Sequence, residues 1–193
     1  MPVTRRQTSE HKALRALLAH AIDYAGLYPP AALSMDAAVQ EYAKQRASLD
    51  AWALGRFVVG MDQLGAFVAA RRSFANARGQ WPISILVTRN NGPHGRDVSG
   101  DVDVLRVEAI EAKASSPAEV QALEWMTALA PELYVEFSPD AELGPLLRAV
   151  RTLGARAKIR TGGVIPSAIP AAEAVARFMR ACVDADVPFK ATA

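Results

Sequence analysis

The sequence predicts an α/β fold: a (β/α) TIM-barrel-like domain of about six parallel strands, forming an incomplete barrel, preceded by two N-terminal helices. Three observations lead to this fold class. From residue 51 onward, short apolar runs alternate with helical patterns at a period of about 25 to 30 residues. Strands that are separated by helical crossovers pair in parallel. No strand is followed by the Gly-x-Gly-x-x-Gly turn of a dinucleotide site, which favours a barrel over an open, doubly wound sheet.

The length of the chain limits how complete this barrel is. A full eight-unit barrel usually needs upward of ~200 residues, and the 193-residue chain stops directly after its sixth predicted strand. We therefore expect the first and last strands to have unpaired edges, which favours self-association into a homo-oligomer. In this interpretation residues 1–193 form one α/β domain, with a helical cover over residues 1–50 and βα repeats over residues 51–193.

Two helices are predicted before the first strand. Apolar residues recur at helical spacing over residues 9–25, and Gly26 is placed to end this helix. Residues 23–31 include a proline pair and are predicted as a turn, because two prolines cannot continue a helix. Ser34 then caps a second helix that extends to about residue 48.

The rest of the chain is predicted as alternating strands and helices. The predicted strands cover residues 53–59, 82–88, 104–112, 133–138, 157–163 and 189–193. The predicted helices cover residues 64–77, 116–129, 141–153 and 167–186. Residues 89–97 are rich in Asn, Gly and Pro and are predicted as a loop, since a full helix hardly fits before the next strand.

Composition excludes several classes of protein. With 51% hydrophobic and 22% charged residues, the chain can bury a sizeable core. A net charge of +2, without a basic cluster interleaved with aromatic residues, gives no support to nucleic-acid binding. The N-terminus has no signal-peptide apolar region, and no run approaches the ~20 apolar residues of a membrane span. The sequence thus predicts a soluble, cytoplasmic protein without a membrane partner.

Polar residues on the predicted strands indicate where chemistry takes place. In a (β/α) barrel the active site is built at the carboxyl ends of the strands. Side chains alternate between the two faces of a strand, so several polar residues share one face. These are Arg106 and Glu108, Tyr134 and Glu136, Lys158 and Arg160, and Lys190. Cations exceed carboxylates in this set, and a buried charge needs a partner, so we expect a small anionic substrate, a carboxylate or a phosphate.

The residues after Arg160 support the same expectation. Thr161, Gly162 and Gly163 are small, and their backbone N–H groups are expected to form a nest for a phosphate or carboxylate oxygen beside Arg160. Together with Arg106, these residues are the predicted anion-binding group.

A lysine beside another cation, desolvated by apolar neighbours, has a lowered pKa and can form a Schiff base with a carbonyl compound. Lys158 and Lys190 are the candidates for this nucleophile and its electrostatic partner. Glu136 or Glu108 would then transfer protons, or would serve as the counter-ion of Arg160. The alternative is structural, because buried Lys–Glu and Arg–Glu pairs also occur as networks that stabilise a barrel.

Metal and redox chemistry have less support. Cys182 is the only cysteine, which excludes an internal disulfide and a cysteine zinc cluster. Glu108, Glu111 and Glu136 are together able to bind Mg²⁺, but carboxylates on separate strands are a weak signal. No metal and no cofactor are predicted.

The three histidines and one N-terminal motif are weaker candidates. His11, His20 and His94 are widely separated and have no metal-ligand spacing. His94, in the 89–97 loop, is a candidate acid or base, the alternative being a solvent-exposed loop histidine. Asp23 and Tyr24 are interpreted as part of a structural turn that positions the N-terminal helices.

Four motifs carry a resemblance to a known family. They are Asp23-Tyr24-Ala25-Gly26-Leu27 with Pro29-Pro30-Ala31, Leu54-Gly55-Arg56-Phe57-Val58, Ala157-Lys158-Ile159-Arg160-Thr161-Gly162-Gly163, and Phe189-Lys190-Ala191-Thr192-Ala193. Through them the chain resembles, over nearly its whole length, an uncharacterised family of bacterial proteins. In those relatives the chain continues into a Gly-Leu-His-His segment and further barrel-like sequence. If those histidines take part in the chemistry, the resemblance implies that this chain is a fragment or an inactive form.

A second resemblance is local. The Lys-x-x-Thr-Gly pattern that begins at Lys158 and the Lys-x-Thr pattern that begins at Lys190 are similar to strand ends of class I, lysine-dependent aldolases of the deoxyribose-phosphate type. It covers only a few residues and implies the same Schiff-base chemistry that the residues suggest by themselves.

The leading hypothesis is therefore a barrel enzyme, a lyase of aldolase type or an isomerase, that acts on a small anionic carbonyl or phosphorylated compound. The alternative hypothesis is a non-catalytic domain that binds an acidic metabolite or a protein partner through the same basic site, or an inactive truncated barrel. Reduction of a lysine adduct separates the two, because only a reactive lysine is reduced onto a ligand.

Overall fold

The computed structural model describes residues 12–74, 79–88 and 104–192. Across these residues the chain forms one all-parallel sheet of seven strands in the order β1-β2-β3-β4-β5-β6-β7. The strands are β1 (Ile22–Tyr24), β2 (Leu54–Gly60), β3 (Trp81–Val87), β4 (Leu105–Lys113), β5 (Glu132–Phe137), β6 (Arg156–Arg160) and β7 (Phe189–Thr192). All six predicted strands are present with small shifts of their ends.

Helices connect the strands. Residues 12–18 are helical, and the α-helices that follow are α2 (Met35–Arg46), α3 (Leu64–Ser73), α4 (Pro117–Gln121), α5 (Leu143–Thr152) and α6 (Ala172–Asp184). Short 3₁₀ helices are η1 (Met61–Gln63), η3 (Glu124–Ala128) and η4 (Pro166–Ala168). Ser34 caps α2, as the sequence predicts, since its hydroxyl accepts a hydrogen bond from the N–H of Ala37. None of the helices within the described residues is both long and apolar enough to cross a membrane.

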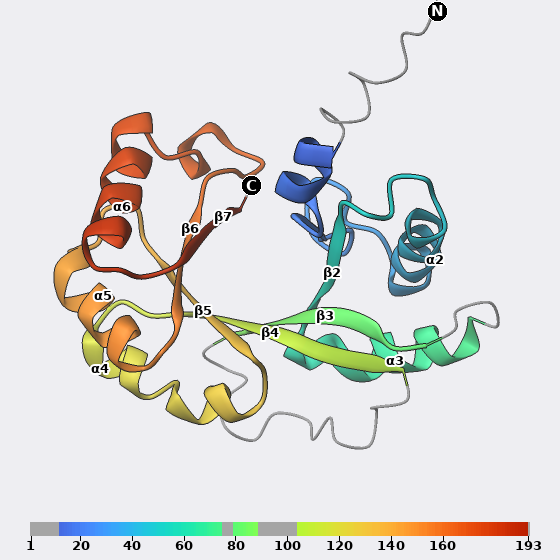
Figure 1. Ribbon diagram of the computed structural model, residues 1–193. Helices are drawn as coiled ribbons and strands as arrows, with labels where there is room; N and C mark the ends of the chain where they lie inside the picture. The colour runs from blue at the N-terminus through green and yellow to red at the C-terminus, as the bar shows by residue number, and fades with distance from the viewer. Residues whose placement is uncertain (1–11, 75–78, 89–103, 193) are drawn as a thin grey trace, which may run out of the picture.

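The sheet curls into part of a barrel, and α2 to α6 lie on its convex side (Figure 1). The concave side, which we call the inner face, carries no helix in this view. In Figure 1 the curve stays open between β7, in red, and the blue N-terminal residues. The incomplete TIM-barrel-like fold expected from the sequence is confirmed.

The first helix is shorter than predicted, and a seventh strand follows it. The helix over residues 9–25 was expected to continue to Ala25, but its described part ends at residue 18. His20 has a positive φ of 55°, which a helix cannot accommodate, and its N–H donates to the carbonyl of Trp52 at 3.0 Å. The chain is thereby turned alongside β2, where Ile22 and Tyr24 pair as β1. The prediction of Asp23 and Tyr24 as a turn was wrong.

The helix predicted over residues 116–129 is divided into α4 and η3. Ser116 caps α4 through the N–H of Glu119. Val120 and Met126 are both buried against the core. Residues six apart lie about 240° apart around an α-helix, so a continuous helix would turn one of them away. The break lets both face the core.

The apolar core lies between the outer face of the sheet and the helices. An aromatic group from α2, β2, α3 and β3 occupies its N-terminal part: the ring centroids of Tyr42 and Trp81 are 5.0 Å apart, and those of Phe57 and Phe67 are 4.7 Å apart. Cys182, on α6, is buried in the same layer, and burial raises the pKa of its thiol to about 11. Since the apolar residues face outward, the inner face is left to polar side chains.

A β-bulge in β4 changes which residues reach the inner face. Ile83 pairs with Val107, but the next residue, Ser84, pairs with Ala109, so Glu108 is an extra residue. Before the bulge even-numbered residues of β4 point inward, and after it odd-numbered residues do. This shift brings Glu111 to the inner face.

Candidate active site on the inner face of the sheet

A buried carboxylate lies at the centre of the inner face. Glu111 Oε2 is 2.7 Å from Lys158 Nζ, and Glu111 Oε1 is 2.8 Å from Lys190 Nζ. The hydroxyl of Ser84 donates to Glu111 Oε1 at 2.6 Å. Lys158 and Lys190 are direct partners in the β6–β7 register, so two lysines on adjacent strands share one carboxylate.

A second carboxylate completes this group. Glu136 Oε2 is 2.7 Å from Lys158 Nζ, and its Oε1 lies 3.4 Å from Lys113 Nζ and 3.6 Å from Arg160 Nε. The side chains of Lys158 and Glu136 are 4% and 9% exposed, whereas those of Lys113 and Arg160 are 71% and 49% exposed. The buried pair therefore lies beneath two solvent-facing cations. We call Ser84, Glu111, Glu136, Lys158 and Lys190 the carboxyl-end cluster.

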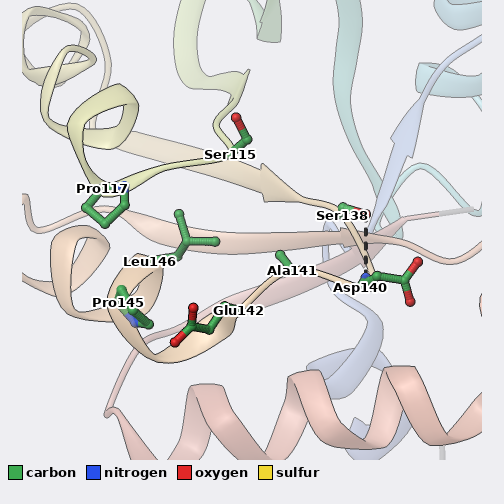
Figure 2. Close-up of a pocket in the computed structure, with 8 residues that line it drawn as sticks. All are labelled: Ser115, Pro117, Ser138, Asp140, Ala141, Glu142, Pro145 and Leu146. Atoms are coloured by element: carbon green, nitrogen blue, oxygen red, sulfur yellow. Dashed lines mark hydrogen bonds between the residues drawn. The ribbon is translucent and has the colours of Figure 1, made fainter.

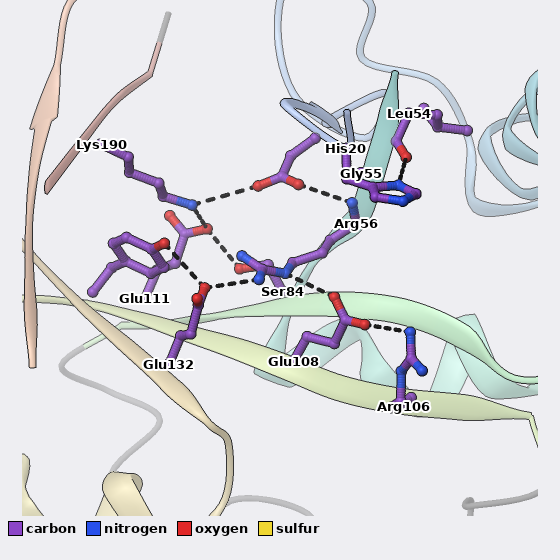
Figure 3. Close-up of polar contacts among 12 residues, drawn as sticks. His20, Leu54, Gly55, Arg56, Ser84, Arg106, Glu108, Glu111, Glu132 and Lys190 are labelled. Atoms are coloured by element: carbon purple, nitrogen blue, oxygen red, sulfur yellow. Dashed lines mark hydrogen bonds and ion pairs between the residues drawn. The ribbon is translucent and has the colours of Figure 1, made fainter. Parts of the chain in front are cut away.

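Lys190 reaches from β7 toward the opposite edge of the sheet. Its Nζ lies 3.5 Å from Asp23 Oδ2 on β1, and 4.3 Å from the centre of the Tyr134 ring. Asp23 Oδ1 accepts a hydrogen bond of 2.8 Å from the backbone N–H of Arg56. Figure 3 shows Lys190, Glu111 and Arg56 directed toward one another from separate strands.

A separate group of charges lies nearer the amino ends of the strands. Arg56 contacts Glu108 at 3.1 Å and Glu132 at 2.7 Å, and Arg156 contacts Glu132 at 3.1 Å. Arg106 pairs with Glu108, and is itself mostly exposed. We call Arg56, Arg106, Glu108, Glu132 and Arg156 the amino-end cluster. Tyr134 joins the two clusters, because its hydroxyl donates to Glu132 while its ring faces Lys190.

The surrounding charges keep the carboxylates ionised. Burial by itself raises the pKa of Glu111, but the charges and hydrogen bonds of Lys158 and Lys190 outweigh burial and lower this pKa to about 2. Burial likewise raises the pKa of Glu136, but the Lys158 ammonium outweighs burial, so the net shift is downward. The pKa of Glu132 is lowered against burial by Arg56. At neutral pH these groups are anions between cations.

The structure brings some of the predicted site residues together and separates others. Lys158, Lys190 and Glu136 meet as expected from strand alternation, and Arg160 lies beside Glu136. Glu108 contacts Arg56 and Arg106 in the amino-end cluster and has no contact with either lysine among the described residues. Arg106 is the second residue of β4 and lies at the amino end, away from the carboxyl ends where the site was expected.

Around the two lysines, sequence reasoning missed four residues, and it also missed Arg56, Glu132 and Arg156 of the amino-end cluster. The four residues are Asp23, Ser84, Lys113 and, except as a possible Mg²⁺ ligand, Glu111. Simple alternation from Glu108 places Glu111 on the outer face, and only the bulge returns it to the inner face. The Glu-Ala-Ile-Glu spacing gives no sign of this bulge. Asp23 was missed because the strand that carries it has only three residues.

The Thr161-Gly162-Gly163 segment does not have nest geometry. Thr161 donates its N–H to the carbonyl of Thr192 at 2.7 Å and so continues the pairing with β7. A nest needs a backbone of alternating handedness, and neither Gly162 nor Gly163 has a positive φ. A Cβ at Gly163 would lie 2.5 Å from the Cβ of Ala168, so this glycine permits close packing of η4.

The remaining candidates give no site. His20 Nδ1 lies 3.0 Å from the carbonyl of Leu54, while His11, His94 and the 89–97 loop lie outside the described residues. In the three described ranges, no three His, Cys, Asp or Glu side chains are grouped as metal ligands.

A cavity of about 290 Å³ lies elsewhere, where the chain leaves β4 and β5 (Figure 2). Its lining residues are Ser115, Pro117, Ser138, Asp140, Ala141, Glu142, Pro145 and Leu146. Two of them are acidic and none is basic, so this cavity is unsuited to the anionic ligand that the sequence suggests. Lys158 and Lys190 lie on the inner face instead.

Comparison of the chain with models of protein families, with curated proteins and with solved structures gave no match.

Proposed function

We propose that the protein is a lyase of aldolase type, or an isomerase, that forms a Schiff base between Lys158 and a small anionic carbonyl compound. The observation that supports this most is the pair of lysines, Lys158 and Lys190, held 2.7 and 2.8 Å from the two oxygens of one buried carboxylate, Glu111. We assign the imine to Lys158 rather than to Lys190. Lys158 is the more buried of the two lysines, and its burial excludes the water that would hydrolyse an imine.

Formation of the imine keeps the positive charge on the lysine nitrogen, which suits a cluster that holds carboxylates beside that nitrogen. A lysine ammonium and a carbonyl group combine to give a protonated imine and one water molecule. Two protons of the ammonium leave with the carbonyl oxygen, and the positive charge stays on nitrogen. The carboxylates of Glu111 and Glu136, which neutralise the Lys158 ammonium, therefore also stabilise the iminium ion.

The iminium ion then accepts the electron pair of the neighbouring carbon–carbon or carbon–hydrogen bond when that bond breaks. Glu136, 2.7 Å from Lys158 Nζ, is placed to accept and return the proton. Lys190 keeps the shared carboxylate of Glu111 ionised during these transfers.

The expectation of an anionic substrate has its support at the rim. The exposed cations Lys113 and Arg160 both form ion pairs with Glu136, which also pairs with Lys158. With Lys158 and Lys190 included, four cations contact the three carboxylates Asp23, Glu111 and Glu136, which leaves one positive charge in excess among these contacts. A carboxylate or phosphate group of the substrate would be bound there, by Lys113 and Arg160 in place of the predicted Arg106.

A non-catalytic role is the second candidate, supported by one observation. Lys158 and Lys190 are each already neutralised by carboxylates of the chain, so the cluster also suits a structural network with anion binding at the rim alone. Such a domain would bind an acidic metabolite or protein partner without forming a covalent bond.

Reduction with borohydride in the presence of pyruvate distinguishes the two. The proposal predicts one pyruvate adduct per chain by intact-mass spectrometry, located on Lys158 by peptide mapping. Lys158→Met should abolish the adduct, Lys190→Met should slow it about tenfold or more, and the exposed Lys44→Met should leave it unchanged. An unmodified wild-type chain that still binds phosphate would favour the non-catalytic role.

A further inference from the structure

The connection between β6 and α6 is an uncharged and largely exposed segment that directly follows the rim cation Arg160. Residues 161–171 contain no charged side chain. Val164, Ile165 and Ile169 are 65%, 56% and 58% exposed. Single exposed apolar side chains are ordinary, but within the described residues no other stretch of six contains three exposed large ones. A concentration of this kind marks a surface that binds an apolar partner.

The three side chains form one patch because the segment folds back on itself. A Cβ at Gly163 would lie 2.5 Å from the Cβ of Ala168, so the two ends of the segment are in contact. The N–H of Ala168 donates to the carbonyl of Ile165 at 3.0 Å, and Ile165 and Ile169 flank the resulting turn η4. Two prolines restrict the backbone of the segment, so little further ordering is needed when a ligand contacts it. We call Val164, Ile165 and Ile169 the apolar patch.

The apolar patch lies at the carboxyl end of the sheet, next to the rim of the carboxyl-end cluster. It begins four residues after Arg160, a distance of at most about 14 Å along an extended chain. The N–H of Thr161 donates to the carbonyl of Thr192 at 2.7 Å, so the start of the segment is attached to the end of β7. In Figure 1 the orange segment between β6 and α6 lies at the same end of the sheet as the end of β7. Loops at this end of a (β/α) barrel are the ones that contact ligands.

The rim and the apolar patch together suit a ligand with two unlike ends. Lys113 and Arg160 offer cations to an acidic group. The three side chains of the patch offer hydrophobic contact only. An acid as small as pyruvate leaves the patch in water, whereas an acid with an apolar chain removes apolar surface of both the ligand and the protein from water.

We propose that the substrate is a 2-oxo acid with an apolar chain, and that this chain packs on Val164, Ile165 and Ile169. The inference rests on the proposed Schiff-base reaction at Lys158 and adds the class of substrate. With the carbonyl carbon at Lys158 and the carboxylate at the rim, the apolar chain extends along the connection between β6 and α6.

The test compares 2-oxooctanoate with pyruvate, which has the same carboxylate and carbonyl groups without the long apolar chain. Reduction of the imine by cyanoborohydride is followed by intact-mass spectrometry, and each rate is divided by the rate for Nα-acetyl-lysine to remove intrinsic reactivity. We expect the wild type to prefer 2-oxooctanoate at least about tenfold after this correction. Ile165→Ser combined with Ile169→Ser should remove most of this preference, by slowing 2-oxooctanoate far more than pyruvate.

A control variant and two further measurements make the outcomes distinct. Val183→Ser removes another exposed apolar side chain, on α6, and should keep the wild-type preference. A wild type without the preference, or a preference that survives Ile165→Ser with Ile169→Ser, would overturn the apolar subsite alone. If the two serines instead abolish binding to phosphatidylglycerol vesicles, or abolish dimerisation, while the preference stays, the patch belongs to a membrane contact or to a second copy. No adduct with either acid would contradict the Schiff-base reaction, and the substrate class with it.

Discussion

Lys190 and Asp23 lie on the two edge strands of the sheet, β7 and β1, and their charged groups are 3.5 Å apart. The two edges of the incomplete barrel are therefore within the combined reach of one lysine and one aspartate. Because Lys190 also contacts Glu111 at 2.8 Å, this link extends from the open side of the curve to its centre. The carboxyl-end cluster depends on both edges being in place.

Asp23→Asn tests this link across the opening. An asparagine still accepts the hydrogen bond from the N–H of Arg56 but loses its charge toward Lys190. We expect a loss of about 1 kcal/mol in unfolding free energy, given that both side chains are partly exposed. Hydrogen exchange should become faster in β1 but not in β4. Equal protection of β1 in variant and wild type would mean that the ion pair does not hold the edges.

Removal of the buried ammonium should destabilise the fold strongly. Lys158→Met leaves Glu111 and Glu136 without their closest cation, and breaking such a buried pair costs about 3–5 kcal/mol. Lys113→Met removes an exposed cation next to the same Glu136 and should cost less than about 1 kcal/mol. Urea unfolding monitored by circular dichroism gives both values. Similar losses for the two variants would show that the Lys158 pairs are solvent-screened.

Acid should weaken the fold through Glu111. Its pKa in the folded state is about 2, below the ordinary value of 4.5, so the folded state binds fewer protons than the unfolded state. The stabilisation is present above pH 4.5 and is lost as the pH falls toward 2. Urea midpoints of the wild type should therefore fall between pH 5 and pH 3. In Glu111→Gln, which starts less stable, this part of the fall should be absent.

The open edges predict self-association. Ile22, on edge strand β1, is 58% exposed, and β7 has no strand on its outer side among the described residues. We expect dimers or larger species in sedimentation velocity at high protein concentration. Ile22→Lys should shift the distribution to monomer, and Leu129→Lys, at an exposed site before β5, should not. A wild-type monomer at every concentration would contradict this prediction.

The sequence predicted the fold because the βα period is carried by local patterns that tertiary contacts did not override. The sequence also predicted that Lys158 and Lys190 lie side by side on adjacent strands, because both belong to regular strands in which alternation holds. Alternation failed in β4, where the extra residue Glu108 reverses the faces, and it is this bulge that makes Glu111 the shared carboxylate. A bulge depends on pairing with the neighbouring strand, so the sequence of β4 alone does not reveal it.

The sequence did not predict Asp23 as a site residue for a different reason. Its strand has three residues and follows an amphipathic helix, so helical spacing continued through it. The helix ends because His20 adopts a positive φ and pairs with the chain before β2, a contact between residues more than thirty positions apart. Short edge strands of this kind are defined by tertiary contacts rather than by local propensity.

The most direct test of the Schiff-base site is a crystal structure of the protein soaked with pyruvate and reduced with borohydride. We predict continuous density from Lys158 Nζ to the ligand, with the pyruvate carboxylate toward Arg160 and Lys113 and with Glu111 still bound to Lys190. An unmodified Lys158 that keeps its contacts of 2.7 Å to both Glu111 and Glu136 would contradict it and identify these charges as a structural network.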